Sequence, residues 1–552
     1  MKKLLALLLA VVLFIGVFAG CSKTDNSSKT VKTASINTES LYPVVTEPVT
    51  LTLAIGVGPT NEDPNNMWFF KYMKEKTGVD TDYMVIQNSA WDEKKPIMLA
   101  TDDLPDIFLG LSFNTTEIMK YGKAGSFIPL NGYIDLYGDM IKEKIDMVDG
   151  AWTGIHCPDG NIYSLPSLTI SFQASGNALS INHEWLKNVG MDFPTTLDEF
   201  YNVMKAFKEQ DANGNGDPND EIPISGSSTE RPFRGQILDA FGLILESGSK
   251  TNMGVTRDGK AVYVPLSEKY KDYLTYMNKL WSEGLIDPDY YTQDLQAVYA
   301  KGEKQLFGVY TNWAPYYFTS KWADWTVISP LVENSGDKPL TFYRTPYNPG
   351  RLTVTKACKN PDVAVRWLNL FYTPEVCKRL FYGPEYGSDE DTEGKGTILY
   401  PEEDGSMHEE VPAWNPDEIG LWDWYCTVNG PGNCMFSCAL DEGYQFEVLY
   451  GADPFKSALP EESLWRLQYL DNVADNRTLP YPPVYLSEEN VNRVDELATA
   501  LNTYVETMEA KFIIGTEPLS NYDAFVSELK RLGAEEYEKI YVDAYEAYLA
   551  NK

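Results

Sequence analysis

The chain has 552 residues, 43% hydrophobic and 23% charged, so it is long enough for several domains and has the composition of a folded protein, not of a disordered or collagen-like one. Acidic residues outnumber basic ones by 80 to 46, and the resulting net charge of −34 repels a nucleic-acid backbone, which excludes nucleic acid as an expected partner. Aromatic residues reach 13%, a content that suits either a large core or flat platforms for sugar rings, and composition does not separate the two.

Residues 1–20 have the layout of a secretory signal. Lys2 and Lys3 precede an apolar run at 4–18 that is short for a membrane span, and small residues lead up to Cys21. The tetrad FAGC at 18–21 resembles the bacterial lipobox, in which the cysteine is lipidated, although phenylalanine stands where leucine is usual. A plain signal peptide cleaved nearby is the alternative. We expect lipidation at Cys21, which holds an extracellular protein on the cell membrane.

Residues 21–45 are polar, rich in Ser, Thr and Lys, and without apolar periodicity, so they predict a flexible linker after the lipidated cysteine. The folded body is expected to begin near Val49. Removing residues 1–20 removes two lysines and no acidic residue, so the net charge falls to −36.

Strands and helices alternate in the first part of the body. The predicted elements, in chain order, are a strand at 49–55, a helix at 67–76, a strand at 83–87, a helix at 91–100 and a strand at 106–110. This alternation predicts an α/β lobe with a parallel sheet. Ligands bind beyond the carboxyl ends of such strands, which nominates the loops at 56–66 and 110–116.

Later helices follow from apolar spacing and start signals. They are predicted from 197 to 207 after the start signal Pro194-Thr195-Thr196, and at 270–283, 361–372, 489–512 and 522–549, the last with a break near Gly533. Between 383 and 438 the chain is rich in acids, aromatics and glycine and is longer than an ordinary loop. We interpret this region as an insertion that lines a site.

The segment DANGNGDPNDE at 211–221 has the pattern of a calcium loop. Oxygen side chains alternate along it and glycine occupies its sixth position, where loops of the EF-hand kind turn sharply. The predicted ligands of a structural Ca²⁺ ion are Asp211, Asn213, Asn215, Asp217, Asp220 and Glu221. Ile222 stands at position twelve, where a bidentate Glu is usual, and Pro223 opposes an outgoing helix, so the motif is a half motif. A polar turn that binds nothing is the alternative.

Cysteine and histidine give little support for disulfides or zinc. Six cysteines follow Cys21, at 157, 358, 377, 426, 434 and 438, and they allow up to three disulfides or, equally, buried thiols. The histidines at 156, 183 and 408 lie far apart, and the pair Cys434 and Cys438 has no obvious second pair. A zinc site is therefore not expected.

A sugar site pairs flat aromatic rings with polar groups, so aromatic residues in loops are the ligand-binding candidates. We expect contacts from Trp91, Trp313, Tyr316, Trp422 and Trp424. Core packing is the alternative for each tryptophan.

Nine short segments together resemble the extracellular solute-binding proteins of bacterial ABC transporters, and are most similar to the carbohydrate-binding branch with alginate-oligosaccharide binders and LplA-like lipoproteins. They span most of the chain and are WFFKYMKEKTG (68–78), DLPDIF (103–108), DGNIYSLP (159–166), WLKNVG (185–190), PTTLDEF (194–200), the loop at 211–221, SEGLID (282–287), KNPD (359–362) and FIIG (512–515). The calcium loop of that family is one residue shorter, which leaves open whether Asn219, Asp220 or Glu221 is a ligand.

The resemblance implies a two-lobed α/β fold like that of periplasmic binding proteins (type II), with a hinge between the lobes. The first crossing is expected near 175–182, with an N-terminal lobe of 46–178 plus about 346–430 and a C-terminal lobe of about 179–345 plus 431–552. It further implies a monomer that captures an oligosaccharide and delivers it to the permease of an ABC importer.

A polysaccharide-processing enzyme, a glycosidase or lyase with two carboxylates across the cleft, is the rival function. The sequence marks out no such pair, contains no Gly-x-Ser-x-Gly motif and carries no phosphate-binding signature. A purely adhesive protein fits the anchor but not the α/β body. Without such signatures, and given the resemblance, we expect a binding protein and no catalysis. Basic residues are scarce in the nominated loops, so we expect a neutral ligand.

Overall fold

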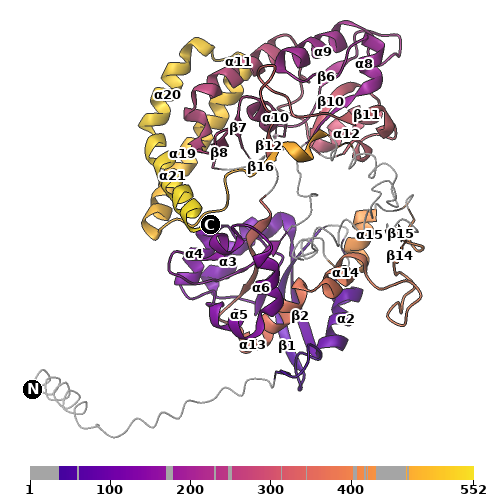
Figure 1. Cartoon of the computed structure of the whole chain (residues 1–552), viewed down its shortest axis with the longest axis vertical. Helices are drawn as coiled ribbons and strands as arrows, with labels where there is room; N and C mark the ends of the chain where they lie inside the picture. The colour runs from indigo at the N-terminus through magenta and orange to yellow at the C-terminus, as the bar shows by residue number, and fades with distance from the viewer. Residues whose placement is uncertain are drawn as a thin grey trace, which may run out of the picture.

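The computed structural model divides into two bodies, one above the other in Figure 1. It describes residues 36–58, 61, 63–168, 178–228, 232–245, 251–312, 314–342, 345–401, 407–415, 418, 421–430, 468 and 472–552. Each body has its own large cluster of buried apolar side chains. One cluster takes residues from 44–168 and 347–426, and the other from 179–331 and 484–548. We call these bodies the N-terminal and the C-terminal lobe.

The N-terminal lobe contains a five-stranded sheet in the order β2-β1-β3-β13-β4. Its strands are β1 (Val49–Val57), β2 (Val79–Gln87), β3 (Ile107–Leu109), β4 (Leu165–Leu168) and β13 (Tyr347–Val354). The predicted parallel pairing is confirmed for β1 with β2 and for β1 with β3. The sheet as a whole is mixed, because β13 returns from the other lobe and pairs antiparallel with β3 and β4. Local alternation does not reveal this long-range insertion.

The C-terminal lobe is built on a four-stranded sheet in the order β11-β5-β10-β6. Its strands are β5 (Ala178–Asn182), β6 (Ile222–Ile224), β10 (Phe307–Asn312) and β11 (Trp325–Val327). β10 is parallel to β6, whereas β5 runs antiparallel to its neighbours β10 and β11. A second sheet of this lobe holds β7 (Leu243–Ile244), β8 (Met253–Thr256) and β9 (Ala261–Tyr263).

Helices surround both sheets (Figure 1). Those of the N-terminal lobe are α2 (Trp68–Thr77), α3 (Trp91–Thr101), α4 (Thr115–Lys123), α5 (Asn131–Tyr137), α6 (Asp139–Asp146), α7 (Ala151–Ile155), α13 (Pro361–Asn369), α14 (Pro374–Tyr382) and α15 (Leu421–Val428). Those of the C-terminal lobe are α8 (His183–Val189), α9 (Leu197–Glu209), α10 (Pro232–Ala240), α11 (Glu268–Ser282), α12 (Leu295–Glu303), α19 (Glu488–Ile514), α20 (Tyr522–Arg531) and α21 (Ala534–Asn551).

Local sequence signals account for several helix boundaries. A capping box opens α9, because the Thr196 hydroxyl accepts from the Glu199 amide while the Glu199 carboxylate accepts from the Thr196 amide. The apolar face predicted for 197–207 is buried in the lobe. Gly533 adopts φ +95° between α20 and α21, a conformation that glycine tolerates, so the predicted break is confirmed.

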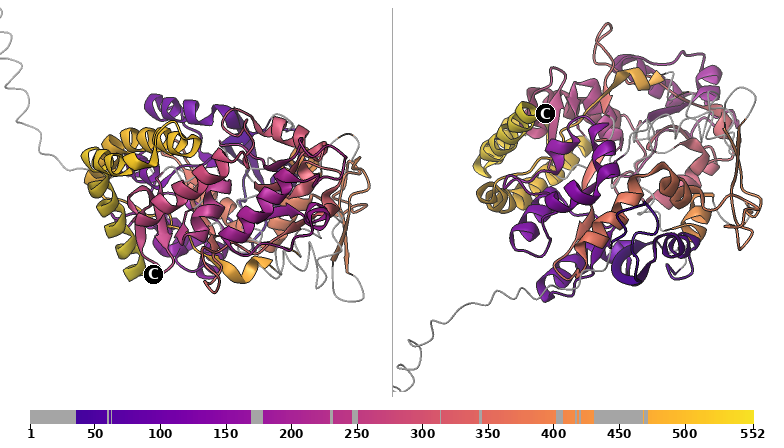
Figure 2. Two further views of the ribbon diagram at one scale, coloured as in Figure 1. Left: turned by 90° about the horizontal axis from the view of Figure 1, so that it is seen from above. Right: turned by 60° about the horizontal axis from the view of Figure 1, so that its bottom comes forward.

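The region expected to be an insertion contains a described hairpin of β14 (Ile398–Pro401) and β15 (Met407–Glu410). In Figures 1 and 2 this hairpin and the C-terminal helices α20 and α21 lie on opposite sides of the molecule. The short parallel pair β12 (Thr341–Phe342) and β16 (Arg477–Thr478) lies on the side of the C-terminal lobe that faces the other lobe (Figure 1).

The structure corrects the predicted start of the folded body. Val44 and Val45 are buried in the core of the N-terminal lobe, and their amides donate to the Thr77 carbonyl at 2.9 and 3.3 Å. Ile36 forms a bridge with Val45. The linker prediction is therefore wrong for residues 36–45, because the apolar side chains of this polar segment pack on a core that lies within reach.

The last helix joins the two lobes. The Thr153 hydroxyl of α7 donates to the Asn551 carbonyl of α21 at 2.9 Å, and Lys552 pairs with Asp149 at 2.5 Å. The hydroxyl of Tyr347, the first residue of β13, donates to the Tyr548 hydroxyl at 3.3 Å. The C-terminus consequently rests on the N-terminal lobe, although the rest of α21 belongs to the other core.

Two further observations concern the thiols and the membrane. Cys157, Cys358, Cys377 and Cys426 are free thiols, and three of them are buried, whereas Cys434 and Cys438 lie outside the described residues. None of the helices in the described part is long and apolar enough to cross a membrane.

Candidate functional site

The carboxyl ends of the parallel strands define one edge of the N-terminal sheet. Val57 is in register with Gln87, and Ile55 with Leu109, so β1, β2 and β3 all end there. The loops that leave this edge begin at Gly58, Asn88 and Gly110, two of them within the segments nominated from the sequence. Such an edge is where α/β sheets place their ligands.

The corresponding edge of the C-terminal sheet lies at the ends of β6 and β10. β6 and β10 are parallel, with Ile224 in register with Val309. The Ser225 loop after β6 and the chain after Asn312 therefore leave the same edge. Asn312 is in register with Ala178, where β5 begins. Only residues 169–177 separate Ala178 from Leu168, which ends β4 at the N-terminal edge beside Tyr347. A connection of this length spans at most about 36 Å, so it keeps the two edges near each other between the lobes.

A packed aromatic cluster supports the N-terminal edge. Trp91 is 7% exposed and packs at 5.7 Å from Phe108 and 5.4 Å from Phe113, measured between ring centroids. Its indole Nε1 donates to the Ser112 carbonyl at 2.9 Å. Lys95 lies 5.6 Å above the same ring and pairs with Glu117 at 2.8 Å. Trp91 is thus held rigidly, with most of its surface covered by protein.

The other predicted aromatic contacts are only partly described. Trp424 is half-buried on α15 and packs against the core of the N-terminal lobe. Trp313 lies outside the described residues, and so do the side chains of Tyr316 and Trp422. Asn312 ends β10 at the C-terminal edge, and Trp313 and Tyr316 follow it in the sequence.

A tight backbone contact shapes the N-terminal edge at Gly350. The Phe113 amide donates to the Gly350 carbonyl at 2.9 Å, and a Cβ atom at Gly350 would lie 1.8 Å from the Phe113 carbonyl oxygen. Only glycine fits this approach. The adjacent Arg351 donates to the Ser112 hydroxyl at 2.5 Å. These two contacts hold the loop after β3 against β13.

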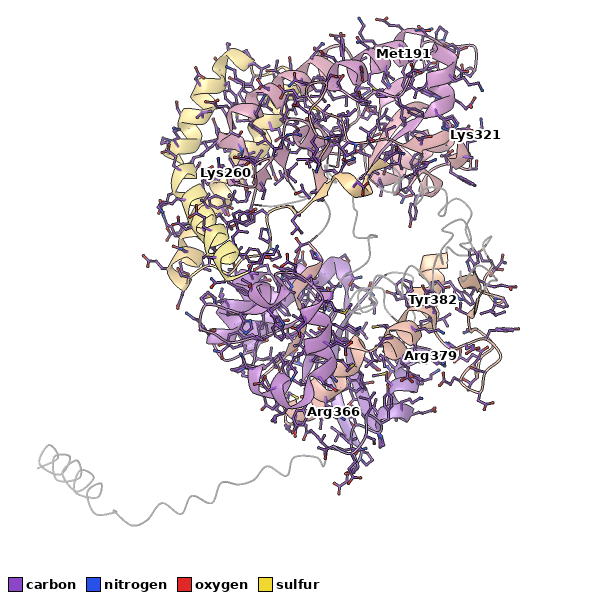
Figure 3. The ribbon with its side chains drawn as sticks, in the orientation of Figure 1. Met191, Lys260, Lys321, Arg366, Arg379 and Tyr382 are labelled. Carbon is purple, nitrogen blue, oxygen red and sulfur yellow. The ribbon has the colours of Figure 1, made fainter. Side chains whose placement is uncertain are left out.

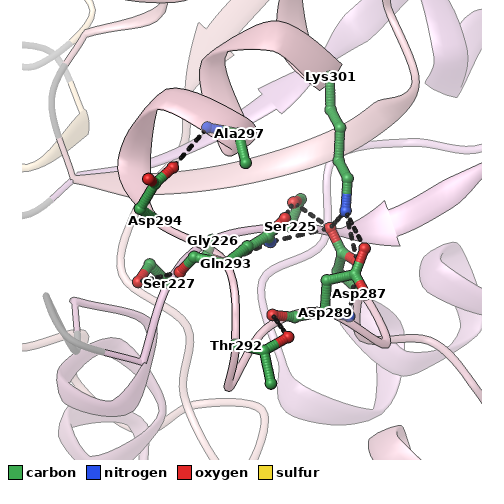
Figure 4. A network of polar contacts seen from close by, with 10 residues as sticks. All are labelled: Ser225, Gly226, Ser227, Asp287, Asp289, Thr292, Gln293, Asp294, Ala297 and Lys301. Carbon is green, nitrogen blue, oxygen red and sulfur yellow. Dashed lines mark hydrogen bonds and ion pairs between the residues drawn. The ribbon is translucent and has the colours of Figure 1, made fainter.

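At the C-terminal edge, a buried carboxylate organises the loop after β6 (Figure 4). Asp287 is fully buried and accepts hydrogen bonds from Lys301 at 2.8 and 2.9 Å, from the Ser225 hydroxyl at 2.6 Å and from Gln293 at 3.0 Å. Gln293 also donates to the Gly226 carbonyl at 2.7 Å. Burial alone would raise the pKa of Asp287, but these donors outweigh it and hold the pKa below its ordinary value.

Sequence reasoning missed this network. The available signal was the segment Ser225-Gly226-Ser227-Ser228, which directly follows a short strand and therefore lies at a carboxyl end. Nothing in the sequence indicated that Asp287 and Lys301, far along the chain, would hold it.

The six predicted calcium ligands lie in one loop between α9 and β6. Asp220 accepts from the Asn213 amide nitrogen at 2.9 Å and from the Asn215 amide nitrogen at 2.7 Å, and the Gly216 amide donates to Asp211 at 2.9 Å. Gly214 and Gly216 have φ values of +70° and +93°, which produce the sharp turn. Asp217 instead faces outward, where its carboxylate accepts from Asn219 at 3.0 and 3.2 Å.

Two carboxylate oxygens of this loop are buried without a hydrogen-bond partner among the described residues: Asp211 Oδ1 and Glu221 Oε2. Burial raises the pKa of Glu221. Unsatisfied buried anionic oxygens next to amide oxygens fit a hard cation such as Ca²⁺. Within the described ranges no three His, Cys, Asp or Glu side chains converge as a metal site, so such a site would depend on the asparagine oxygens as well.

Comparison with known proteins identifies the family. The family model described as "Bacterial extracellular solute-binding protein" matches residues 60–376, more than half of the chain. The fructooligosaccharide ABC transporter substrate-binding protein FusA of Streptococcus pneumoniae serotype 4 (strain ATCC BAA-334 / TIGR4) is 26% identical over 560 residues, which cover 98% of this chain and 97% of FusA. Lipoprotein LipO of Bacillus subtilis (strain 168) is 27% identical over 53% of this chain and 52% of its own.

Solved structures agree with the sequence matches. FusA in complex with kestose superposes with a TM-score of 0.72 at 25% identity, covering 91% of this chain and 100% of FusA, and a structure of a FusA EF-hand mutant gives 0.71. An extracellular solute-binding protein of Bifidobacterium longum subsp. infantis gives 0.74 at 21% identity, covering 91% and 98% of the two chains, which supports the two-lobed α/β fold. These relatives are transport binding proteins and not polysaccharide-cleaving enzymes. The chain belongs to the bacterial extracellular solute-binding protein family.

Proposed function

We propose that this protein captures an oligosaccharide between its two lobes and delivers it, chemically unchanged, to the permease of an ABC importer. The observation that carries the proposal is the match to FusA, a fructooligosaccharide binder of an ABC transporter, over nearly the entire length of both chains. The two sheet edges that lie toward each other support it, because they supply polar and aromatic groups from both lobes.

Capture works through closure of the lobes. The proposed lobes are about 36–178 with 346–430, and 179–345 with 431–552, and the division of the two hydrophobic cores supports this assignment. A ligand that contacts both edges binds the closed form more tightly than the open form and shifts the equilibrium toward closure. The closed shape is then what the permease recognises, and no bond of the ligand is broken.

The ligand contacts are assigned to aromatic rings at the two edges. Trp313 and Tyr316 are proposed as ligand contacts of the C-terminal lobe, and Trp422 and Trp424 as ligand contacts of the N-terminal lobe. Trp91 supports the N-terminal edge from behind and does not contact the ligand, because its ring is largely covered and its nitrogen is bonded to Ser112. Rigid rings lose little conformational entropy when a sugar stacks on them.

A neutral sugar suits the charges at the edges. Lys95 is paired with Glu117, and Lys301 is paired with Asp287 and Asp289, so neither lysine offers an uncompensated charge to a uronate. The whole chain is strongly acidic, with a net charge of −34. An anionic ligand would meet this field, and neither lysine is free to match its charge.

The protein is further proposed to act as a monomer, anchored outside the cell through a lipidated Cys21. The FAGC tetrad supports the anchor, and the relative LipO is named a lipoprotein. The anchor keeps the binding protein close to its membrane permease.

Calcium is proposed as a structural ion of the 211–221 loop. The buried oxygens of Asp211 and Glu221 would hold it, with the side chains of Asn213, Asn215 and Asp220 and the backbone carbonyl of Asp217 completing the set. When bound, Ca²⁺ supplies only charge neutralisation and fixes the loop between α9 and β6. The EF-hand named for FusA supports a related loop in this chain.

Ligand addition is expected to raise the melting temperature and to reduce the radius of gyration. At a concentration one hundred times Kd, a neutral oligosaccharide stabilises the folded state by about 2.7 kcal/mol. Differential scanning fluorimetry against neutral and uronic oligosaccharides, followed by small-angle X-ray scattering of the best pair, measures both effects. Stabilisation by uronates alone contradicts the neutral ligand, and chromatography that finds the glycan shortened contradicts transport binding.

Removing calcium is expected to lower the melting temperature. A chelator should destabilise the protein by about 1–3 kcal/mol, added Ca²⁺ should restore it, and Asp211→Asn should abolish the response. Asp258→Asn, an exposed carboxylate in a turn of the same lobe, is the control that keeps the response. Equal melting curves with and without chelator would remove the calcium assignment.

A further inference from the structure

A hollow of about 470 Å³ opens on the flank of the C-terminal lobe, between α12 and the chain that leaves β10. Its aromatic walls are Tyr299, Tyr317 and Trp322, and Phe318 forms its floor. Tyr317 is 51% exposed, an unusually open position for a large ring. The volume lies within the range of small-molecule sites. Lys321, which precedes Trp322, marks the margin of the lobe in Figure 3.

The floor of this hollow is rigid. Phe318 is 3% exposed and packs at 4.7 Å from Tyr310 and 5.2 Å from Trp325, both edge to face. Gly302 of α12 permits this packing, since a Cβ atom there would lie 2.4 Å from the Phe318 ring. Because Phe318 is already packed in place, ligand binding would cost little conformational entropy for ordering the floor of the hollow.

The polar rim of the hollow is built around one carboxylate. Glu303 accepts hydrogen bonds from the Ser320 amide at 3.1 Å and from the Ser320 hydroxyl at 2.9 Å, which orient it. A carboxylate has lone pairs for further donors, such as the hydroxyl groups of a sugar. Its negative charge disfavours phosphates and uronates. Aromatic walls with an oriented acceptor thus match a neutral sugar ring.

One wall of the hollow, α12, leads from the edge that faces the other lobe toward the start of β10, where Gln305 donates to Thr319. Tyr317 follows soon after Asn312, the end of β10, and α12 starts beside the Ser225 loop, where Gln293 donates to Gly226. From there α12 and the segment at 317–322 run back along the flank, which places Glu303 and Ser320 farther from the edge.

We infer that this hollow is an outer subsite, which binds the sugar unit of a longer oligosaccharide that projects beyond the interlobe site. The inference rests on the proposed function and adds a basis for chain-length preference. Short ligands are held between the lobes alone, whereas longer ligands gain the stacking surface of Tyr317 and Trp322.

The test is isothermal titration of the full protein with one neutral oligosaccharide series, from disaccharide to hexasaccharide, chosen by the fluorimetry screen above. For Tyr317→Ala and Trp322→Ala we expect Kd to rise about ten-fold for the longer members and to stay unchanged for the shortest binding member. Phe193→Ala removes another exposed aromatic ring of the same lobe, 47% exposed and outside the hollow, and should change no Kd.

The possible outcomes distinguish a failure of the proposed function from a failure of the outer subsite. If the unaltered protein binds no glycan, the proposed function fails together with the subsite. If it binds glycans but both variants match it at every length, or lose affinity equally for all lengths, the outer subsite alone is wrong. Melting temperatures of the variants, expected within a few degrees of the unaltered protein, exclude misfolding as the cause.

Discussion

Replacing Glu509 by glutamine is expected to destabilise the protein by about 3–5 kcal/mol, because it leaves the Arg234 guanidinium buried without its counter-ion. The Arg234 Nε atom lies 2.9 and 3.0 Å from the two carboxylate oxygens of Glu509, and the two side chains are only 8% and 12% exposed. Tyr270 donates to the same carboxylate at 2.5 Å. The pair fastens the C-terminal helix α19 to α10, so its loss should loosen the lobe. Chemical denaturation followed by circular dichroism measures the effect.

Two controls make this prediction specific. The double variant Arg234→Met with Glu509→Leu removes both charges and should recover much of the lost stability, since no charge stays buried. Glu536→Gln breaks the pair of Glu536 with Arg493, whose side chains are 50% and 41% exposed, and should cost much less stability, because water screens an exposed pair. If Glu509→Gln cost no more than Glu536→Gln, the buried pair would not stabilise the lobe in the way argued.

The local elements of the fold were predictable from the sequence. The alternation at 49–55 marks β1, the apolar face at 197–207 marks α9, and Gly533 marks the break between α20 and α21. Each signal depends on residues that are neighbours along the chain, within one strand or a few helical turns. Periodicity and capping report such local order directly.

Long-range arrangement was not predictable in the same way. β13 enters antiparallel between β3 and β4 although it begins 179 residues after the end of β4 and 238 residues after the end of β3, and local alternation does not indicate such a pairing. The docking of 36–45 depends on Val44 and Val45 finding a core that other segments build. The family resemblance, which integrates information over the whole chain, supplied the two-lobed arrangement that local patterns could not.

The candidate site shows the same limit. The rule that ligands lie at carboxyl ends of strands nominated the loops after β1 and β3, and spacing alone nominated the 211–221 loop. Which side chains support those loops is a tertiary fact. Neither the Asp287 network nor the tie from Arg351 to Ser112 could be read from spacing, because their members lie on separate segments.

Asp287→Ala is expected to reduce both stability and ligand affinity. The substitution removes the acceptor of Lys301, Ser225 and Gln293 at once and should cost about 3 kcal/mol. The Ser225 hydroxyl then loses its acceptor, and Gln293, which holds Gly226, loses one of its own partners. The loop at the C-terminal edge is therefore less well fixed, so Kd for the oligosaccharide should rise about ten-fold or more, even under conditions where the variant is folded. Thermal denaturation and calorimetric titration measure the two effects separately.

The matched control is Asp289→Ala, because Asp289 contacts the same lysine at 2.9 Å but is 60% exposed. It should cost at most about 1 kcal/mol and leave Kd unchanged. Acid titration gives a second check. The pKa of Asp287 is lower in the folded state than in the unfolded state, so its stabilisation is complete above about pH 4 and is lost as the pH falls through the folded value. The alanine variant should lack that acid-dependent loss. Equal losses of affinity in both variants would show that charge near Lys301, and not the buried anchor of the Ser225 loop, controls binding.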